Sequence, residues 1–213
     1  MARKRWGVDS AAPADAALLK CVETSYGFPS YWGRYLTETQ GSVLTKKEIQ
    51  FLQSKEIKIH LYNVFMQAIS YENGRTAARN AAFHARKLSI PNGVAIFANI
   101  GNFFEADAGW ITGWVESLIP SGYRAGIYNN PEKEPFPEAY CQAVKQNKEI
   151  AVQSILWSAE PETGISTARK APAYLPAHPN CKSNVWIWKY GIDAKKCSIN
   201  TNLCDERLLA YLF

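Results

Sequence analysis

The sequence lacks the long hydrophobic run that a membrane-spanning helix requires, so we expect no membrane partner. It also lacks the glycine or proline excess of fibrous and low-complexity chains, with 13 glycines and 11 prolines in 213 residues. Charged residues make up only 20% of the chain and hydrophobic residues 47%, which excludes intrinsic disorder. We therefore expect one globular domain over residues 1–213, in a protein that is a monomer.

Strong charge and a secretory leader are also missing. The net charge is +5, and Arg3, Lys4 and Arg5 supply much of it at the very start of the chain. The rest is nearly neutral, which argues against a nucleic-acid partner. Asp9 stands where a signal peptide needs its apolar segment. We therefore expect a chain that is cytoplasmic as synthesised, with a cell-wall target left open.

Motifs for metals and cofactors are absent as well. The five cysteines form no CxxC pair, so a finger-like zinc site is not expected, and no metal site is predicted. Without a secretory signal the cysteines are expected to be free thiols, although Cys181, Cys197 and Cys204 are close enough in sequence for one disulfide among them. No glycine-rich phosphate loop follows the first strand and no GxSxG motif occurs. We expect no cofactor.

What the sequence does contain is an alternation of short apolar segments with longer amphipathic ones. The apolar segments predict strands at residues 6–9, 31–36, 57–63, 94–99, 123–128, 149–157 and 184–190. The amphipathic segments predict helices at residues 14–24, 45–54, 71–88, 108–119 and 137–148. Four prolines predict that residues 158–180 form mostly loop, with a short strand near residues 173–175, and a short helix is expected within residues 203–213.

Strands that alternate with helices are typical of a parallel sheet with crossover helices. Both an open doubly wound sheet and a closed barrel fit this pattern. The missing phosphate loop disfavours the open nucleotide-binding sheet. We therefore predict an α/β fold, an irregular TIM-like barrel. Since 213 residues is short for such a barrel, we expect helices to be missing in the last third of the chain.

The candidate binding residues are those that end the expected strands, because ligands bind at the carboxyl ends of strands in such folds. These positions carry aromatic, amide and charged side chains: Asp9, Arg34, Tyr62, Asn63, Asn99, Tyr128, Trp157, Trp188 and, beyond them, Glu160. Rings that stack on sugar faces and amides that bind hydroxyl groups suit a carbohydrate ligand. Two alternatives stay open: the aromatic residues pack inside the barrel, and Arg34 pairs with Asp9 instead of a ligand.

Several short segments, in this order, resemble a bacterial glycoside-hydrolase-like domain family of unknown function. They are Trp6–Ser10, Arg34–Leu36, Ile59–Asn63, Tyr71 with Gly74 and the alanines that follow, Ile90–Pro91, and Gly122–Tyr128. That family is similar to the family 25 lysozymes (muramidases), and the resemblance extends from about residue 6 to residue 202. It implies a TIM-like barrel and a glycan ligand of the peptidoglycan type.

The resemblance also implies acidic residues, of which the sequence keeps only some. An aspartate on the first strand is matched by Asp9. An Asp-x-Glu pair after the fourth strand is replaced by residues 99–101, Asn-Ile-Gly, and a late Asp-x-Asn is replaced by residues 200–202, Asn-Thr-Asn. A Trp-Gln-Tyr motif reads Trp-Lys-Tyr at residues 188–190. Amides form hydrogen bonds but do not transfer protons at neutral pH.

Two main functions follow from this pattern. One is a glycoside hydrolase acting on peptidoglycan or a related glycan, with Asp9 and a loop glutamate, Glu105 or Glu160, as the carboxyl pair. The alternative is a non-catalytic carbohydrate-binding barrel that has lost the acidic pair at Asn99 and Gly101. A two-acid hydrolase needs its second carboxyl group within about 10 Å of the first. A barrel that binds a small molecule or a protein is a third reading.

Overall fold

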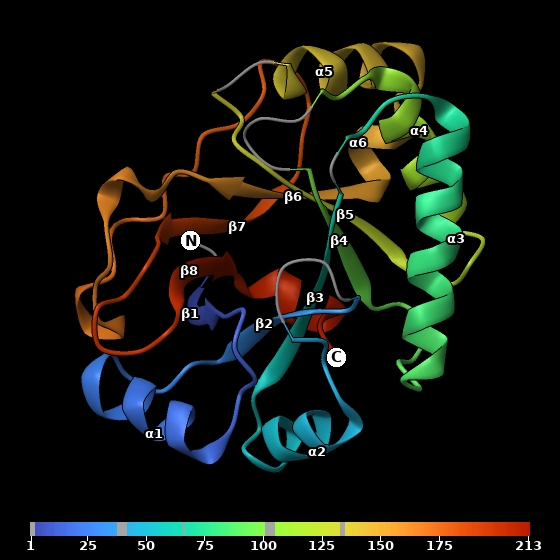
Figure 1. Cartoon of the computed structure of the whole chain (residues 1–213). Helices are drawn as coiled ribbons and strands as arrows, with labels where there is room; N and C mark the ends of the chain where they lie inside the picture. The colour runs from blue at the N-terminus through green and yellow to red at the C-terminus, as the bar shows by residue number, and fades with distance from the viewer. Residues whose placement is uncertain (1–2, 38–41, 66, 101–104, 133–134) are drawn as a thin grey trace.

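The computed structural model describes residues 3–37, 42–65, 67–100, 105–132 and 135–213. Within these ranges, eight strands form a closed barrel in the order of the sequence (Figure 1). The strands are β1 (Lys4–Asp9), β2 (Tyr31–Tyr35), β3 (Lys58–Val64), β4 (Ala95–Asn99), β5 (Arg124–Asn129), β6 (Ser154–Ala159), β7 (Val185–Gly191) and β8 (Asn200–Asp205). The helices are α1 (Ala16–Ser25), α2 (Lys46–Ser54), α3 (Tyr71–Lys87), α4 (Ala108–Leu118), α5 (Phe136–Gln146) and α6 (Glu149–Gln153). No helix in the described part of the chain is long and apolar enough to cross a membrane.

The predicted α/β barrel is confirmed, and its irregularity lies in the last third of the chain. Strands β1 to β7 run parallel to their neighbours, whereas β8 is antiparallel to both β7 and β1 and closes the barrel. The connection from β6 to β7 carries only the short 3-10 helices η1 (Pro161–Thr163) and η2 (Ala168–Lys170). No described residue of the β7–β8 connection is helical.

Three predicted elements differ from the structure. Residues 149–157 are not one strand: α6 precedes β6, and the polar start of the segment is the helix. Residues 203–213 are not one helix, because β8 runs to Asp205 before the 3-10 helix η3 (Glu206–Tyr211) begins. Residues 173–175 form no strand.

Local sequence signals explain where the helices begin and how two of them pack. The Asp15 carboxylate accepts the Leu18 amide and so caps the first turn of α1. Helices α3 and α4 cross at a glycine, because a Cβ atom at Gly74 would lie 2.1 Å from the Trp110 carbonyl oxygen. This close approach puts the alanine-rich face of α3 against its neighbour.

The barrel interior is filled by large side chains, so it is a packed core and not a pore. Inward-facing residues include Tyr31, Phe97 and Trp157, all buried. At the amino end of the barrel, η3 contributes Leu208 to the same cluster, and the Glu206 amide donates to the carbonyl of Arg3. The polar residues around Asp9 lie at the opposite, carboxyl end of the strands.

The expectation of free thiols was wrong for four of the cysteines. Cys21 on α1 is bonded to Cys197 in the β7–β8 connection, and Cys141 on α5 is bonded to Cys181 ahead of β7. Cys204 is buried on β8 and forms no disulfide with the other four cysteines. Cys197 pairs with a cysteine 176 residues earlier and Cys181 with one 40 residues earlier, so no disulfide joins Cys181, Cys197 and Cys204 to one another.

Candidate functional site

Asp9, the last residue of β1, is the centre of a polar network at the carboxyl end of the barrel. Its Oδ2 accepts hydrogen bonds from Lys189 Nζ at 3.0 Å and from Asn200 Nδ2 at 2.8 Å. Its Oδ1 accepts one from Asn202 Nδ2 at 2.7 Å. Gly33 on the neighbouring strand β2 leaves room for the Asp9 side chain. Any other residue at position 33 would place its Cβ atom 2.6 Å from Asp9 Cβ. Asp9 itself is 2% exposed.

Lys189 and Asp9 form an ion pair within this network. Burial alone lowers the pKa of Lys189, but the adjacent Asp9 carboxylate outweighs burial, and the pKa lies above its ordinary value. The ammonium group also lies 4.7 Å from the ring centres of both Tyr128 and Trp157, within range of cation–π attraction. Lys189 is therefore a fixed positive charge held by a carboxylate and two rings.

An aromatic layer lies directly beneath the ion pair. Trp157 Nε1 donates to Asn202 Oδ1 at 3.0 Å, so the indole is oriented by the same amide that binds Asp9. Its ring packs against His60, with the ring centres 4.4 Å apart. Burial lowers the pKa of His60 to about 3, so the imidazole is neutral. Neither of its nitrogens has a hydrogen-bond partner within the described part of the chain.

The structure brings together five of the residues proposed from the sequence. Asp9, Tyr62, Asn99, Tyr128 and Trp157 lie on the inner side of the barrel strands, where Asn99 pairs in register with Tyr128. Asn99 and Tyr128 are half-buried, whereas Tyr62 and Trp157 are buried. The half-buried pair is therefore the part of this set that a ligand can reach.

Three of the proposed binding residues lie on the outer side of the strands. Asn63 accepts a hydrogen bond from Thr37 Oγ1 at 3.1 Å. Trp188 is buried against Tyr174, whose ring centre lies 6.3 Å away. Arg34 was expected to pair with Asp9, but its side chain points away from the barrel interior. The strand period of two explains this placement, because Arg34 follows Gly33, whose inward side faces Asp9.

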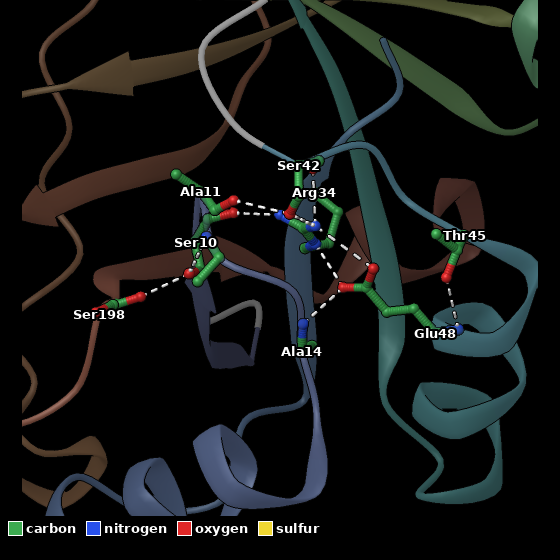
Figure 2. Close-up of polar contacts among 9 residues, drawn as sticks. Ser10, Ala11, Ala14, Arg34, Ser42, Thr45, Glu48 and Ser198 are labelled. Carbon is green, nitrogen blue, oxygen red and sulfur yellow. Dashed lines mark hydrogen bonds and ion pairs between the residues drawn. The ribbon is translucent and has the colours of Figure 1, made fainter. Parts of the chain in front are cut away.

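Arg34 instead pairs with Glu48 of α2 and holds the segment that follows Asp9 (Figure 2). Arg34 Nε donates to Glu48 Oε1 at 2.5 Å, and Arg34 Nη1 donates to the Ser10 carbonyl at 2.7 Å. Glu48 Oε1 also accepts the Ala14 amide at 2.7 Å, and Arg34 Nη2 donates to the Ser42 carbonyl at 2.9 Å. The buried pair therefore fixes the loops that follow β1 and β2.

The two glutamates proposed as a catalytic acid lie outside the hydrogen-bond network of Asp9. Glu105 is exposed ahead of α4. The carboxylate of Glu160, just beyond β6, accepts the Ala177 amide at 2.9 Å and the hydroxyl hydrogen of Ser158. The described contacts of Asp9 include neither glutamate. Gly101, named with Asn99 as a lost acid, lies outside the described residues.

Lys189, Asn200 and Asn202 were absent from the candidate binding residues, although the lysozyme-like motifs at residues 188–190 and 200–202 contain them. Two signals were present: Lys189 stands between two outward aromatic residues, and the two asparagines are two positions apart, as strand neighbours on one face are. The antiparallel pairing of β8 with β1 brings the two asparagines to Asp9, because its register places Asn200 opposite Asp9. Among the described residues, no group of three or more histidine, cysteine, aspartate or glutamate side chains could hold a metal ion.

Comparison with known proteins relates this chain to one protein by sequence and to others by fold alone. No protein-family model and no curated protein matches the sequence. A solved structure of an uncharacterized protein from B. stearothermophilus is 48% identical, covers 98% of this chain and 100% of its own, and has a TM-score of 0.97. This chain belongs to the same family as that protein.

This chain shares the fold of the family 25 lysozymes. A glycosyl hydrolase 25 of Streptococcus pneumoniae aligns at a TM-score of 0.60 with 15% identity, over 98% of this chain and 92% of its own. The modular autolysin LytC of the same species, solved in complex with a synthetic peptidoglycan ligand, aligns at a TM-score of 0.60 with 12% identity. That alignment covers 94% of this chain and 46% of the autolysin. At these identities the likeness concerns the fold.

Proposed function

We propose that this protein binds a peptidoglycan-type glycan at the carboxyl end of its barrel and does not cleave it with a pair of carboxylates. The observation that carries the proposal is the Asp9–Lys189 ion pair, which occupies the carboxylate at the centre of the site. A two-acid glycosidase needs one carboxyl group to gain or lose a proton and another to act as base or nucleophile. Asp9 already accepts hydrogen bonds from an ammonium group and two amides, so it is not available for either of these roles.

The groups that surround the ion pair are suited to binding sugars. Tyr128 offers a half-buried ring, and Asn99 and Asn200 offer half-buried amides at the same end of the barrel. Rings stack on the apolar faces of sugars, and an amide can accept and donate toward neighbouring hydroxyl groups. The glycan class is supported by the lysozyme-like fold and by the synthetic peptidoglycan bound to the autolysin that shares it.

The competing function is hydrolysis by Asp9 together with Glu105 or Glu160. One observation favours it: Glu160 directly follows β6, at the end of the barrel that carries Asp9. For hydrolysis, Glu160 would have to leave the Ala177 amide and Asp9 would have to be released from Lys189. The experiment below separates the two functions.

The test is sedimentation with purified insoluble peptidoglycan, combined with measurement of soluble sugar fragments. We expect the wild type to sediment with the glycan and to release no fragments. Tyr128→Ala should weaken binding about tenfold, the equivalent of about 1.4 kcal/mol for one lost aromatic contact. Glu138→Gln, an exposed change on α5, is the control and should bind like the wild type.

Two results would contradict the proposal. Fragment release by the wild type that disappears in both Asp9→Asn and Glu160→Gln would establish hydrolysis instead. A wild type that neither sediments with peptidoglycan nor releases fragments would exclude a peptidoglycan ligand.

A further inference from the structure

A polar hollow of about 290 Å³ lies beside the Asp9 network, at the rim where β1 meets β8. One wall is the segment that follows β1, and the other is the β7–β8 connection. The lining residues are Ser10, Ala11, Ala12, Asp193, Ala194, Ser198, Ile199 and Asn200. The lining thus combines hydroxyl, carboxylate and amide groups with small apolar side chains, and of these residues the proposed function so far uses only Asn200.

Asn200 joins this hollow to the ion pair. Its Nδ2 donates to Asp9 Oδ2 at 2.8 Å, and its Oδ1 accepts the Asp193 amide at 3.0 Å. The two sites thus share one side chain as a wall. A glycan strand that lies across the carboxyl end of the barrel would reach the hollow directly from Asp9.

Asp193 is the charged residue among those that line the hollow. Its side chain is exposed, and within the described ranges its carboxylate has no hydrogen bond or ion pair. Its backbone has φ of 56°, in the left-handed region, which is unfavourable for a residue other than glycine although aspartate tolerates it better than most. Residues held in such conformations cluster at binding and catalytic sites.

Both walls are held by bonds that do not depend on a ligand. The Cys21–Cys197 disulfide ties the β7–β8 connection to α1. On the other side, Ser10 Oγ donates to the Ser198 carbonyl at 2.6 Å, and the Ser10 carbonyl is held by Arg34 (Figure 2). A preformed site loses little conformational entropy on binding, so even a small hollow can bind a ligand specifically.

We propose that this hollow is a binding subsite for one neutral sugar unit of the glycan, with the Asp193 carboxylate accepting hydrogen bonds from a ring hydroxyl and from the neighbouring N-acetyl N–H of that unit. Ala11 and Ala12 provide the small apolar surface for the CH face of the ring, and the exposed Ser198 hydroxyl provides a further donor and acceptor. The volume is at the lower end of the range for small-ligand sites, which suits a single ring. The inference rests on the proposed glycan-binding function.

The experiment is titration of the isotope-labelled protein with the N-acetylglucosamine tetramer, followed by backbone amide chemical shifts. We expect shifts at Ser10, Asp193 and Ser198. Asp193→Gly keeps the left-handed backbone and removes the carboxylate, so it should weaken binding at least tenfold while the fold stays intact. Asp193→Asn, which keeps one acceptor, should bind with intermediate affinity, and Glu138→Gln should bind like the wild type.

The outcomes distinguish this inference from the function on which it rests. Shifts confined to Asn99 and Tyr128, with Asp193→Gly binding as tightly as the wild type, would overturn the subsite and leave the glycan site at the barrel end intact. A wild type that shows no shifts anywhere and does not sediment with peptidoglycan would overturn both.

Discussion

The Lys189 ammonium lies 3.0 Å from Asp9 Oδ2, and both side chains are less than a tenth exposed. The pair links β7 to β1 across β8, whose two asparagines complete the coordination of the carboxylate. A buried ion pair with satisfied hydrogen bonds is a fixed structural unit, and removal of one partner leaves the other charge buried without compensation. Loss of either side chain should therefore destabilise the fold.

Replacement of the Lys189 ammonium group should destabilise the folded protein. We expect Lys189→Met to lower the free energy of unfolding by about 3–5 kcal/mol, because Asp9 stays buried without its counter-charge. Adding Asp9→Asn to Lys189→Met should recover part of the loss. Urea denaturation of the two single variants and the double variant measures this, and strictly additive losses would show that the two side chains do not interact.

The stability that this pair provides should be independent of pH near neutrality. Since the pKa of Lys189 is raised in the folded protein, the stabilisation is fully present below the ordinary lysine pKa of about 10.4 and is lost as the pH rises through the higher folded-state value. The difference in unfolding free energy between the wild type and Lys189→Met should thus stay constant from pH 6 to pH 9. A difference that shrinks steadily over this range would contradict an ion pair.

His60 should make the protein sensitive to acid. Burial lowers the pKa of His60 to about 3, below its value of about 6.5 in an unfolded chain. Protonation therefore favours the unfolded state, so stability is full above pH 6.5 and falls as the pH drops, by up to about 1.4 kcal/mol per pH unit from this one group. Urea denaturation of His60→Leu at pH 7 and pH 4.5 should show a smaller loss on acidification than the wild type. An equal loss in both proteins would place the acid sensitivity elsewhere.

The Arg34–Glu48 pair should be essential for the loops that follow β1 and β2. Arg34→Met leaves Glu48 buried without its guanidinium partner and frees the carbonyls of Ser10 and Ser42, so we expect a loss of about 3–5 kcal/mol. Arg75→Met, which breaks an exposed pair with Glu72 on α3, is the control and should cost less than about 1 kcal/mol. Thermal or urea denaturation compares the two, and equal losses would contradict a special role for the buried pair.

The two disulfides predict the number of free thiols in the protein. Thiol titration of the denatured but unreduced protein should detect one thiol per chain, that of Cys204. Reduction should then lower the unfolding midpoint, with Cys21–Cys197 contributing more than Cys141–Cys181 because it closes the longer loop, by roughly 5 against 4 kcal/mol at most. Measurement of Cys21→Ser and Cys141→Ser variants separates the two. Five reactive thiols before reduction would contradict both bonds.

Some features of the site were predictable because they depend on neighbours in sequence. Asp9 ends an apolar segment, and Tyr128 and Trp157 stand near the ends of two others, so strand-end chemistry was visible without a structure. Arg34 illustrates the limit of this approach. It stands beside a strand end as well, but a shift of one position turns a strand residue to the other face, and its partner Glu48 lies on a helix.

The sequence by itself determined the alternation of strands and helices, the barrel class and the polar character of the strand ends, because periodicity and capping act over a few neighbouring residues. The tertiary structure decided which of those polar groups meet. The antiparallel closure by β8 brings Asn200 and Asn202 to Asp9, the barrel brings Lys189 of β7 to the same carboxylate, and chain folding pairs Cys21 with Cys197. These contacts join residues more than 170 positions apart, and no local preference encodes such a distance.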